Sequence, residues 1–540
     1  MRYLTAIAIG PVQEFIAAAR RCRDLWCGSQ LLSELSKAAA LALRKRGATL
    51  IFPAPENLED LAAQSGFTVV NKLLASVDAE DIRRSVQEVQ EAVQGRLERA
   101  ADLRTMKLRG LVVKEEVYWR QLRGLLEFYA AWVPQGECYT ESRSRVEELL
   151  AARKALRDFP AYEGAEGECK SSLDGARENV IQKRSRRLYE SNLKENEYLD
   201  AIGIVKRFGG GSVRFDSTVD VAAVPFVQGI EKGSEKRTDA FRRYQRFLRV
   251  HGLPPETYSL LYEHESRQLF HEDEAANEEL KGIREALGKP NAPYFVLFSG
   301  DGDKMGCAIS GLDSSQSHQD FSKALSGFAG QARVLIDSER YGGCSIYCGG
   351  DDVLALLPLH TALDCAKAVN DLFRERLKQY SVTFSAGLVV AHGLEPLTEV
   401  RAWAKEAEHA AKTDGGRDAL CISIHPRSGS PIAVCGKWDE LCGLLQRIAG
   451  LYDGIPRGLG YEMRDLVERL EGWDELSSTL RDLVLAVANK KDCDPAALQL
   501  IKDEAKDRAS IKRLYRSMLV ARWFARAERE ARGDGANDSN

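Results

Sequence analysis

The clearest alternation of apolar and polar positions along the chain lies between residues 294 and 424. Short apolar runs of strand length alternate there with longer segments whose apolar residues recur every three to four positions, the period of an amphipathic helix. The pattern predicts strands over 294–298, 344–348, 353–358, 382–390 and 419–424, and helices over about 316–337, 361–378 and 399–412. The second and third strands form a predicted hairpin, so the element order is βαββαβ, which is typical of a four-stranded ferredoxin-like sheet.

The remaining chain is largely helical by the same criterion. Helical spacing recurs in three further stretches: about 78–158, 236–287 and 436–530. An apolar run over 3–9 predicts a buried strand, and a turn follows at Gly10-Pro11. The stretch 209–228 begins with three consecutive glycines and then carries Val, Phe and Thr in alternation, which predicts strands.

Length and charge narrow the class of protein. The 540 residues suffice for roughly three to four domains. A net charge of −4 excludes a chain that is basic as a whole and coats nucleic acid, so any contact with RNA or DNA has to come from local patches. No stretch approaches about 20 consecutive apolar residues, so no membrane span is expected.

Cysteine and histidine usage excludes further classes. Twelve cysteines are spread along the chain without a Cys-x-x-Cys pair, which favours a reduced, cytoplasmic protein over a disulfide scaffold or a zinc ribbon. The eight histidines all lie beyond residue 250, and none precedes an aspartate. The sequence therefore predicts that an N-terminal His-Asp metal hydrolase domain is absent.

Two acidic turns carry the strongest chemical signal. Asp301 and Asp303 follow the first predicted strand directly, and the segment Gly349-Gly350-Asp351-Asp352 occupies the tip of the predicted hairpin. Because the first strand and the hairpin are neighbours in a ferredoxin-like sheet, the two turns are expected to meet at one edge. Either motif alone is commonly a solvent-exposed turn, but the two together, each after a buried strand, favour a shared site.

Carboxylates gathered in this way repel one another unless a cation neutralises them. Hard oxygen ligands suit Mg²⁺ or Mn²⁺, and two such metals can activate a hydroxyl group and clamp a triphosphate for in-line attack. The predicted metal ligands are Asp301, Asp303, Asp351 and Asp352. The neighbouring glycines, Gly302, Gly349 and Gly350, would allow a nucleotide to approach the backbone closely.

Four side chains are further candidate nucleotide contacts. Lys304 lies in the first acidic turn, and Ser385 lies on a strand where small residues would let a base or ribose pack closely, although ordinary strand packing explains Ser385 equally well. Lys412 and Arg417, at the end of the next predicted helix, would neutralise phosphates. A basic residue at a helix C-terminus is also a routine partner of the helix dipole, so both interpretations stay open.

A basic stretch in the middle of the chain, Phe241–Arg249, interleaves arginines with aromatic residues. Such a stretch could contact RNA phosphates. It also fits an amphipathic helix whose aromatic residues are buried and whose arginines are solvated.

These motifs resemble a known family. Gly-Gly-Asp-Asp, with Asp-Gly-Asp-Lys-Met-Gly upstream and Ala-Lys…Gly-Arg downstream, resembles the palm of GGDEF-type nucleotide cyclases. More narrowly, it is similar to the large palm subunit of type III CRISPR RNA-guided effector complexes. The run Ile9–Ile16, with Arg23–Trp26 and Asp200–Gly203, resembles the Cmr (III-B) branch, so the resemblance covers nearly the whole chain.

The resemblance implies an α+β fold class with two ferredoxin-like (βαββαβ) palm domains and with intervening and C-terminal α-helical domains. The expected domains are an N-terminal palm-like domain with a helical insertion over 1–160, linker strands and a helical domain over 161–290, the GGDD palm over 291–428, and a C-terminal helical domain with a disordered tail over 429–540. In the first palm, four side chains would either touch a second nucleotide or hold the subunit together: Gln13, Arg20, Arg23 and Trp26.

The resemblance also implies a function, the target-RNA-activated and metal-dependent conversion of ATP into a cyclic oligoadenylate messenger for antiviral defence. Asp301 and Asp351 would bind metal, and Asp352 would assist the second metal or the nucleophile. Lys412 would hold the triphosphate. The implied partners are other effector subunits, CRISPR RNA and target RNA, within a hetero-oligomer.

Two departures from the family pattern modify these expectations. Many relatives carry an N-terminal His-Asp nuclease domain, and here the chain opens on the first palm, so DNA cleavage of that type is expected to be absent. Many relatives also carry a Cys-x-x-Cys zinc knuckle. The matching stretch has Ser171 and Asp174 at the cysteine positions and keeps only Cys169, so structural zinc is not expected.

Three other functions stay open. The chain could be a catalytically silent scaffold that anchors the 5′ end of the CRISPR RNA, although clustered carboxylates disfavour that role because of their mutual repulsion. It could transfer adenylate to another metabolite. It could also be a stand-alone diguanylate cyclase, which Asp352-Val353 disfavours because that family has Glu-Phe at these positions.

Overall fold

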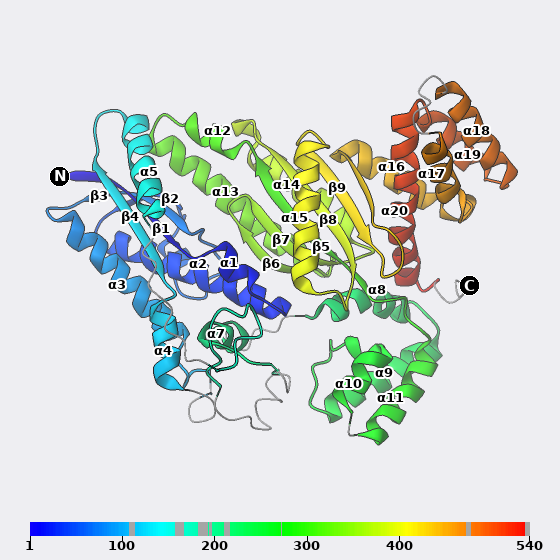
Figure 1. Cartoon of the computed structure of the whole chain (residues 1–540), viewed down its shortest axis with the longest axis horizontal. Helices are drawn as coiled ribbons and strands as arrows, with labels where there is room; N and C mark the ends of the chain where they lie inside the picture. The colour runs from blue at the N-terminus through cyan, green and yellow to red at the C-terminus, as the bar shows by residue number, and fades with distance from the viewer. Residues whose placement is uncertain are drawn as a thin grey trace.

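The computed structural model describes residues 1–106, 108, 114–156, 167–181, 193, 197–209, 216–271, 273–470 and 477–534. Two β-sheets organise this part of the chain, and each contains a βαββαβ unit whose strands pair in the ferredoxin-like order (Figure 1). The predicted α+β fold class with two palm domains is therefore confirmed.

The first palm holds the antiparallel sheet β2-β3-β1-β4. Its elements are β1 (Arg2–Gly10), α1 (Gln13–Ala17), α2 (Cys22–Lys45), β2 (Thr49–Phe52), η1 (Leu58–Leu61), β3 (Lys72–Asp78), α3 (Ile82–Ala100), α4 (Glu115–Arg123), β4 (Glu127–Pro134) and α5 (Tyr139–Ala155). Successive side chains of a strand point to opposite faces. Ile7 and Ile9 of β1 therefore pack in one core with α2 and α3, and Leu4 and Ala6 pack in another with α5.

The second palm holds the sheet β10-β9-β8-β5-β7-β6. Its elements are β5 (Tyr294–Asp303), α12 (Met305–Ser310), α13 (Ser315–Ile336), β6 (Cys344–Gly349), β7 (Asp352–Pro358), α14 (Ala362–Arg376), η3 (Lys378–Tyr380), β8 (Thr383–His392), α15 (Leu397–Thr413), β9 (Ala419–His425) and β10 (Ile432–Lys437). Val296 and Phe298 pack under α13 and α14, whereas Phe295 and Leu297 pack under α15 and under α2 of the first palm. The first palm thus helps to cover the sheet of the second.

All of the elements predicted between 294 and 424 are present, and the structure adds the short helices α12 and η3, which were not predicted. The strands also differ from the prediction in two respects. Strand β5 continues through the first acidic motif to Asp303, because it pairs with β8 along its whole length. The sheet also gains an unpredicted edge strand, β10, which pairs antiparallel with β9.

Direct hydrogen bonds also join the two palms along α13. The side chain of Gln319 donates to the Leu50 carbonyl at 2.7 Å, and Ser322 accepts from the backbone N–H of Ala54 at 2.9 Å. The Tyr139 hydroxyl lies 2.7 Å from Nδ1 of buried His318. Polar contacts that are shielded from water fix one relative orientation of two domains more firmly than exposed ones do.

Helices make up the rest of the described chain. Between the palms lie α7 (Ala201–Phe208), α8 (Thr218–Glu231), α9 (Glu235–Val250), η2 (Ser259–Leu261), α10 (Glu263–Leu269) and α11 (Glu274–Leu287). After the second palm lie α16 (Trp438–Gly450), η4 (Tyr452–Gly454), α17 (Leu459–Arg469), α18 (Ser477–Lys490), α19 (Pro495–Glu504) and α20 (Arg508–Arg532). The tail predicted to be disordered lies, from residue 535 onward, outside the described residues.

The strands predicted over 209–228 are wrong where the structure describes this stretch. Residues from Thr218 onward form α8, whose N-terminus is closed by a capping box between Ser217 and Asp220. Helix α8 packs against α20 and against the sheet of the second palm, so it is buried on nearly every side. Periodicity alone does not separate a helix buried in this way from a strand. Residues 210–215 lie outside the described residues.

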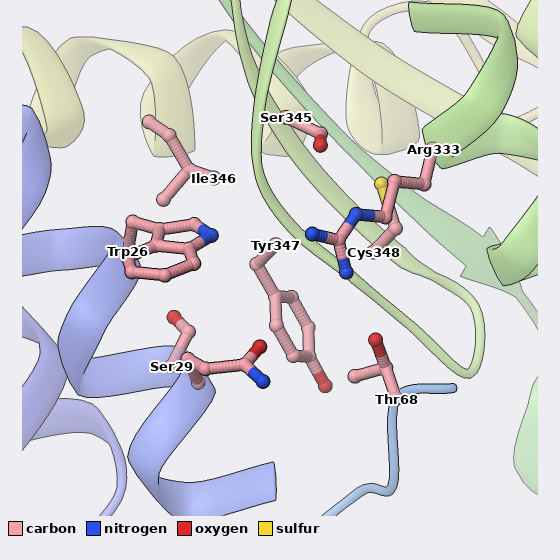
Figure 2. Close-up of a pocket in the computed structure, with 9 residues that line it drawn as sticks. Trp26, Ser29, Thr68, Arg333, Ser345, Ile346, Tyr347 and Cys348 are labelled. Atoms are coloured by element: carbon pink, nitrogen blue, oxygen red, sulfur yellow. The ribbon is translucent and has the colours of Figure 1, made fainter. Parts of the chain in front are cut away.

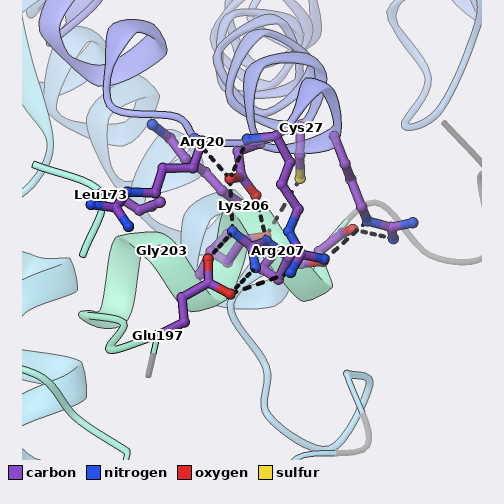
Figure 3. A network of polar contacts seen from close by, with 12 residues as sticks. Arg20, Cys27, Leu173, Glu197, Gly203, Lys206 and Arg207 are labelled. Carbon is purple, nitrogen blue, oxygen red and sulfur yellow. Dashed lines mark hydrogen bonds and ion pairs between the residues drawn. The ribbon is translucent and has the colours of Figure 1, made fainter. Parts of the chain in front are cut away.

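A buried ionic network ties α7 to the first palm (Figure 3). The fully buried guanidinium of Arg207 donates to Asp24 on α2 at 2.7 and 2.9 Å and to Glu197 at 2.7 and 2.9 Å. Arg23 donates to the carbonyls of Arg207 and Gly209 at the end of α7. Charges can be buried only when partners satisfy them this completely. Arg23 therefore has a structural role, one of the two alternatives that the sequence leaves open.

Two further observations concern cysteines and membranes. Cys421 and Cys435 lie directly opposite each other on β9 and β10 and form a disulfide, whereas the other ten cysteines are free. The expectation of a fully reduced protein therefore differs from the structure at one pair, which sequence spacing could not identify because strand register sets it. Among the described residues, no helix combines the length and the apolar character needed to cross a membrane.

Candidate active site

The two acidic turns meet at the end of the central strands of the second palm. Strand β5 pairs with β7 up to Gly300 and Val353, so Asp301 lies level with Asp352, where β7 begins. The carboxyl of Asp301 lies within hydrogen-bonding reach of both Asp351 and Asp352. The structure thus brings Asp301 into contact with two of the other three predicted carboxylates, Asp351 and Asp352.

This contact changes the protonation chemistry of the turn. Burial, followed by the charge of Asp301, raises the pKa of Asp351 to about 7. The pKa of Asp352 is raised as well, by desolvation among its neighbours and by the charges of Asp351 and Asp301, although its side chain reaches the surface. Raised pKa values of adjacent carboxyls indicate an excess of negative charge, which a cation would relieve.

A lysine supplies positive charge at this point. The ammonium group of Lys412, near the end of α15, forms an ion pair with Oδ2 of Asp301 and a second ion pair, at 3.2 Å, with Oε1 of Glu408. Glu408 in turn accepts a hydrogen bond from the Ser299 hydroxyl at 2.7 Å. Although burial lowers the pKa of Lys412, the hydrogen bond and charge of Asp301 leave it raised. Lys412 therefore stays protonated in this site.

Asp303 is held differently from the other carboxylates. It is 2% exposed, and its oxygens accept hydrogen bonds from the hydroxyls of Ser385 and Thr383 and from the backbone N–H of Asp418. Its oxygens thus fix the loop between α15 and β9 to strands β5 and β8. The same contacts commit the Ser385 hydroxyl to Asp303, so Ser385 supports the site from beneath.

Three glycines allow the close approach of the acidic turns. A Cβ atom on Gly302 would lie 2.9 Å from Cβ of Asp351, and one on Gly349 would lie 2.4 Å from the Tyr347 hydroxyl. Gly350 has a positive φ of 63° in the turn, a conformation that favours glycine. These positions are needed to form the turn itself, whether or not a nucleotide also approaches them.

The two remaining basic candidates lie at the rim. Lys304 and Arg417 are exposed and have positive φ values of 59° and 60°, so each sits in a tight backbone bend. Each bend is next to an element of the site, since Lys304 follows Asp303 and Arg417 precedes Asp418. Neither side chain contacts the three carboxylates through any bond among the described residues.

The first palm borders the acidic hairpin. A small pocket between α2 and β6 is lined by Trp26, Ser29, Gln30, Thr68, Arg333, Ser345, Ile346, Tyr347 and Cys348 (Figure 2). Tyr347 lies at its centre and is two residues before Gly349. At the tip, Gly350 lies close to Val70 of the first palm, at 3.4 Å from a Cβ atom built on the glycine. Trp26 therefore lies at the contact between the palms rather than on solvent.

The donor set suits a divalent cation, although no metal geometry is formed. Among the described residues, no group of three or more His, Cys, Asp or Glu side chains is arranged to hold a metal ion. Lys412 neutralises Asp301 in its place. Three carboxyls in contact, two of them with raised pKa values, are a hard oxygen donor set that fits Mg²⁺ or Mn²⁺. The two-metal site remains a prediction.

Sequence reasoning missed two contributors, Glu408 and Ser299. Each has a signal that could have found it. Glu408 lies four residues before Lys412, so both side chains share one face of α15. Ser299 lies two residues before Asp301, so both point to the same face of β5.

Two other predicted features are placed outside this site. The hydroxyl of Ser171 binds Asp200 at 3.1 Å, which ties the stretch matching the zinc knuckle to the start of α7. On α9, Phe241, Tyr244 and Phe247 are buried, whereas four arginines are exposed: Arg242, Arg243, Arg246 and Arg249. The helix is thus amphipathic, and its aromatic rings are not available to bases.

Comparison with known proteins agrees with this architecture. The family model "Cas10/Cmr2, second palm domain" matches residues 294–421, and the model "CRISPR-associated protein Cmr2, N-terminal" matches residues 4–102. The CRISPR system Cmr subunit Cmr2 of Pyrococcus furiosus is 25% identical over 551 residues, which cover 81% of this chain. The chain spans 63% of the length of that relative.

Solved structures show the same fold. The type III-B Cmr-beta cryo-EM structure of the apo state matches with a TM-score of 0.64 at 12% identity, over 91% of this chain and 77% of the other. Cmr-beta bound to cognate target RNA gives the same score at 13% identity, with coverage of 91% and 78%. Csm1 of T. onnurineus scores 0.50 at 13% identity, over 97% and 69%.

Fold and site together define a palm-domain protein whose second palm is nucleotidyltransferase-like and similar to that of Cas10/Cmr2. Within this class, the chain is similar to Cmr2 in its N-terminal segment and over most of its length, and its fold is similar to that of the type III-B Cmr-beta structure.

Proposed function

We propose that this chain is the large subunit of a cytoplasmic type III-B CRISPR ribonucleoprotein whose second palm converts ATP into cyclic oligoadenylate when guide RNA is paired with target RNA. The observation that carries the proposal is the contact of Asp301 with Asp351 and Asp352, with Lys412 beside them. Such a site suits phosphoryl chemistry, which depends on positioning and on charge stabilisation.

Each residue of the site has a role in this proposal. Asp301 and Asp351 would hold divalent cations, and Asp352 would complete the second position or orient the attacking hydroxyl. Bound cations would lower the pKa of that hydroxyl and neutralise charge that develops on the triphosphate. Lys412 would bind the β- and γ-phosphates as a point charge. Asp303 and Ser385 would keep the strand ends in place.

RNA is the proposed partner for which the structure offers a surface. The four exposed arginines of α9 lie between Arg242 and its C-terminus, where acidic residues are absent, and only Arg242 has an ion pair among the described residues, with Asp239. The neighbouring helix α11 has four exposed glutamates: Glu274, Glu278, Glu279 and Glu285. The basic face of α9 and the acidic face of α11 can therefore be compared in tests of contact with an RNA backbone.

The test of this surface is RNA binding at several salt concentrations. Arg243→Gln with Arg246→Gln should weaken binding of single-stranded RNA by the assembled complex severalfold. The salt dependence of binding should also fall, by about one unit for each phosphate that the variant no longer neutralises. Lys281→Gln on α11 is the control. Equal binding by all variants would remove α9 from the RNA surface.

The test of the activity is product analysis by mass spectrometry. The assembled complex would be incubated with CRISPR RNA, matching target RNA, Mg²⁺ or Mn²⁺ and all four nucleoside triphosphates. Cyclic oligoadenylates that require target RNA, and that vanish with Asp351→Ala plus Asp352→Ala while assembly persists, would support the proposal. Adenylate joined to another metabolite would change the substrate. Binding of guide and target without a nucleotide product would favour the scaffold.

A further inference from the structure

The contacts of Lys412 present a conflict that the proposed activity has to resolve. Oδ2 of Asp301 is occupied by the Lys412 ammonium in this structure. A divalent cation at Asp301 would compete with that ammonium for the same carboxylate, since two cations at one oxygen repel each other. Lys412 therefore needs a second anchor if it is to remain in the site after a cation has bound.

Glu408 provides that anchor. Its Oε1 lies 3.2 Å from Nζ of Lys412, one helical turn along α15, and its Oε2 accepts the Ser299 hydroxyl at 2.7 Å. The Glu408 side chain is only 19% exposed, and Gly387 of β8 lies against its backbone N–H, so helix and strand hold the carboxylate in place. Since Ser299 and Asp301 share one face of β5, the residue that fixes Glu408 and the first partner of Lys412 stand on the same strand.

We infer that Glu408, fixed by Ser299, is the positioning residue that retains Lys412 beside the carboxylates when a divalent cation takes over Asp301. Glu408 touches neither substrate nor metal in this arrangement, and it acts through the lysine. The inference rests on the proposed function only for what happens afterwards, when Lys412 turns from Asp301 to a triphosphate. The displacement of Lys412 from Asp301 needs only the protein and a divalent cation, and no nucleotide.

The first measurement is binding of Mn²⁺ to the assembled complex without nucleotide, followed by electron paramagnetic resonance. Glu408→Gln should weaken Mn²⁺ binding by about three- to tenfold, because Lys412 then depends on Asp301 alone. Ser299→Ala should act in the same direction with a smaller effect. Glu406→Gln, an exposed position on the same helix, is the matched control and should change binding less than about twofold.

A double-variant cycle separates positioning from a simple loss of negative charge. In the Lys412→Met background, Glu408→Gln should change Mn²⁺ affinity by less than about twofold, since no lysine remains to be held. If Glu408→Gln weakens Mn²⁺ binding equally in both backgrounds, the inference is wrong and Glu408 acts only through its field. Thermal denaturation of each variant shows whether the fold is retained.

The second measurement concerns the nucleotide. In a complex with activity, Glu408→Gln should raise KM for ATP by about three- to tenfold while kcat changes less than about twofold, because a loosely held Lys412 binds the ground-state triphosphate less well. If the unaltered complex binds Mn²⁺ but forms no cyclic product, the proposed function fails and the Mn²⁺ cycle still decides the role of Glu408. A variant that loses kcat with an unchanged KM would contradict the positioning role.

Discussion

The two palms have the same strand order but differ at the position where chemistry would occur. In the second palm, β6 and β7 are joined by a tight turn that presents Asp351 beside the end of β5. In the first palm, residues 53–71 separate the corresponding strands β2 and β3, and β1 ends at Gly10 without a carboxylate motif. The fold thus repeats while the site does not, which shows that the ferredoxin-like sheet is a frame and that its turns decide the chemistry.

The long connection of the first palm has a role of its own. Val70, near its end, lies against Gly350 at the tip of the acidic hairpin, and Thr68 lines the pocket around Tyr347. The first palm therefore supports the hairpin of the second from outside. The longer connection between β2 and β3 thus gives the first palm a contact with the second palm.

The largest expected contrast between the palms comes from single carboxylates. Asp301→Asn should lower cyclic oligoadenylate formation at least about 100-fold, since it removes a charge that the other two carboxyls and Lys412 all contact. Asp60→Asn, on the long connection of the first palm, should leave the activity within about twofold. Initial rates of the assembled complexes measure both, and equal losses would show that the palms share the chemistry.

The buried hydroxyl beneath the site should govern stability more than turnover. Ser385→Ala removes the hydroxyl that donates to the buried Asp303 carboxylate and should lower the free energy of unfolding by about 2 kcal/mol. Urea denaturation provides the measurement. Ser423→Ala, whose hydroxyl contacts the His425 ring rather than a carboxylate, is the control and should cost less. A loss of ATP binding in Ser385→Ala at full stability would instead restore its predicted nucleotide contact.

Lys412 should behave as a ligand-binding group and not as a packing group. Lys412→Ala should raise KM for ATP about tenfold, because it removes one charge-assisted interaction with the triphosphate. Thermal stability should change little, because both partners of the ion pair reach solvent, with side chains 20% and 29% exposed, and such pairs contribute little to folding. Steady-state kinetics and a melting curve decide the matter, and a large drop in melting temperature would favour the packing interpretation.

The smallest expected effect concerns the contact between the palms. Burial, then the charge of Arg143, lowers the pKa of His318 to about 4, below its ordinary value of 6.5. Between pH 6.5 and 4, His318 is therefore protonated in the unfolded chain and neutral in the folded chain. The stability present above pH 6.5 is lost as the pH falls towards 4. When the pH is lowered from 7 to 5.5, the free energy of unfolding of His318→Gln should fall by about 1 kcal/mol less than that of the unaltered protein. A parallel pH profile for both proteins would remove His318 from the linkage.

The sequence was sufficient for features that rest on local pattern. Strand and helix periodicity located every strand and the three long helices between 294 and 424, and the family resemblance implied the ferredoxin-like sheet of the first palm. The meeting of Asp301 with Asp351 followed from strand order alone. Helix α8 was missed because it is buried on nearly every side, which removes the polar face that marks a helix.

Features that depend on which side chains meet were harder to predict from the sequence. Nothing in the spacing shows that the oxygens of Asp303 accept hydrogen bonds from Thr383, Ser385 and the backbone of Asp418. Asp301, in contrast, contacts Lys412 and the carboxyls of the hairpin. Strand register and loop closure decide this difference. The same holds for the pairing of Cys421 with Cys435 across two strands.

The Arg207 network has a practical consequence for dividing the chain. A fragment ending near residue 160, the predicted domain boundary, would leave Asp24 buried without the guanidinium that neutralises it. The same cut would strip the first core of Leu199, Ile202 and Val205, which pack within it. The shortest fragment of the first palm that can be expressed as a folded protein therefore has to run through α7, to about residue 209.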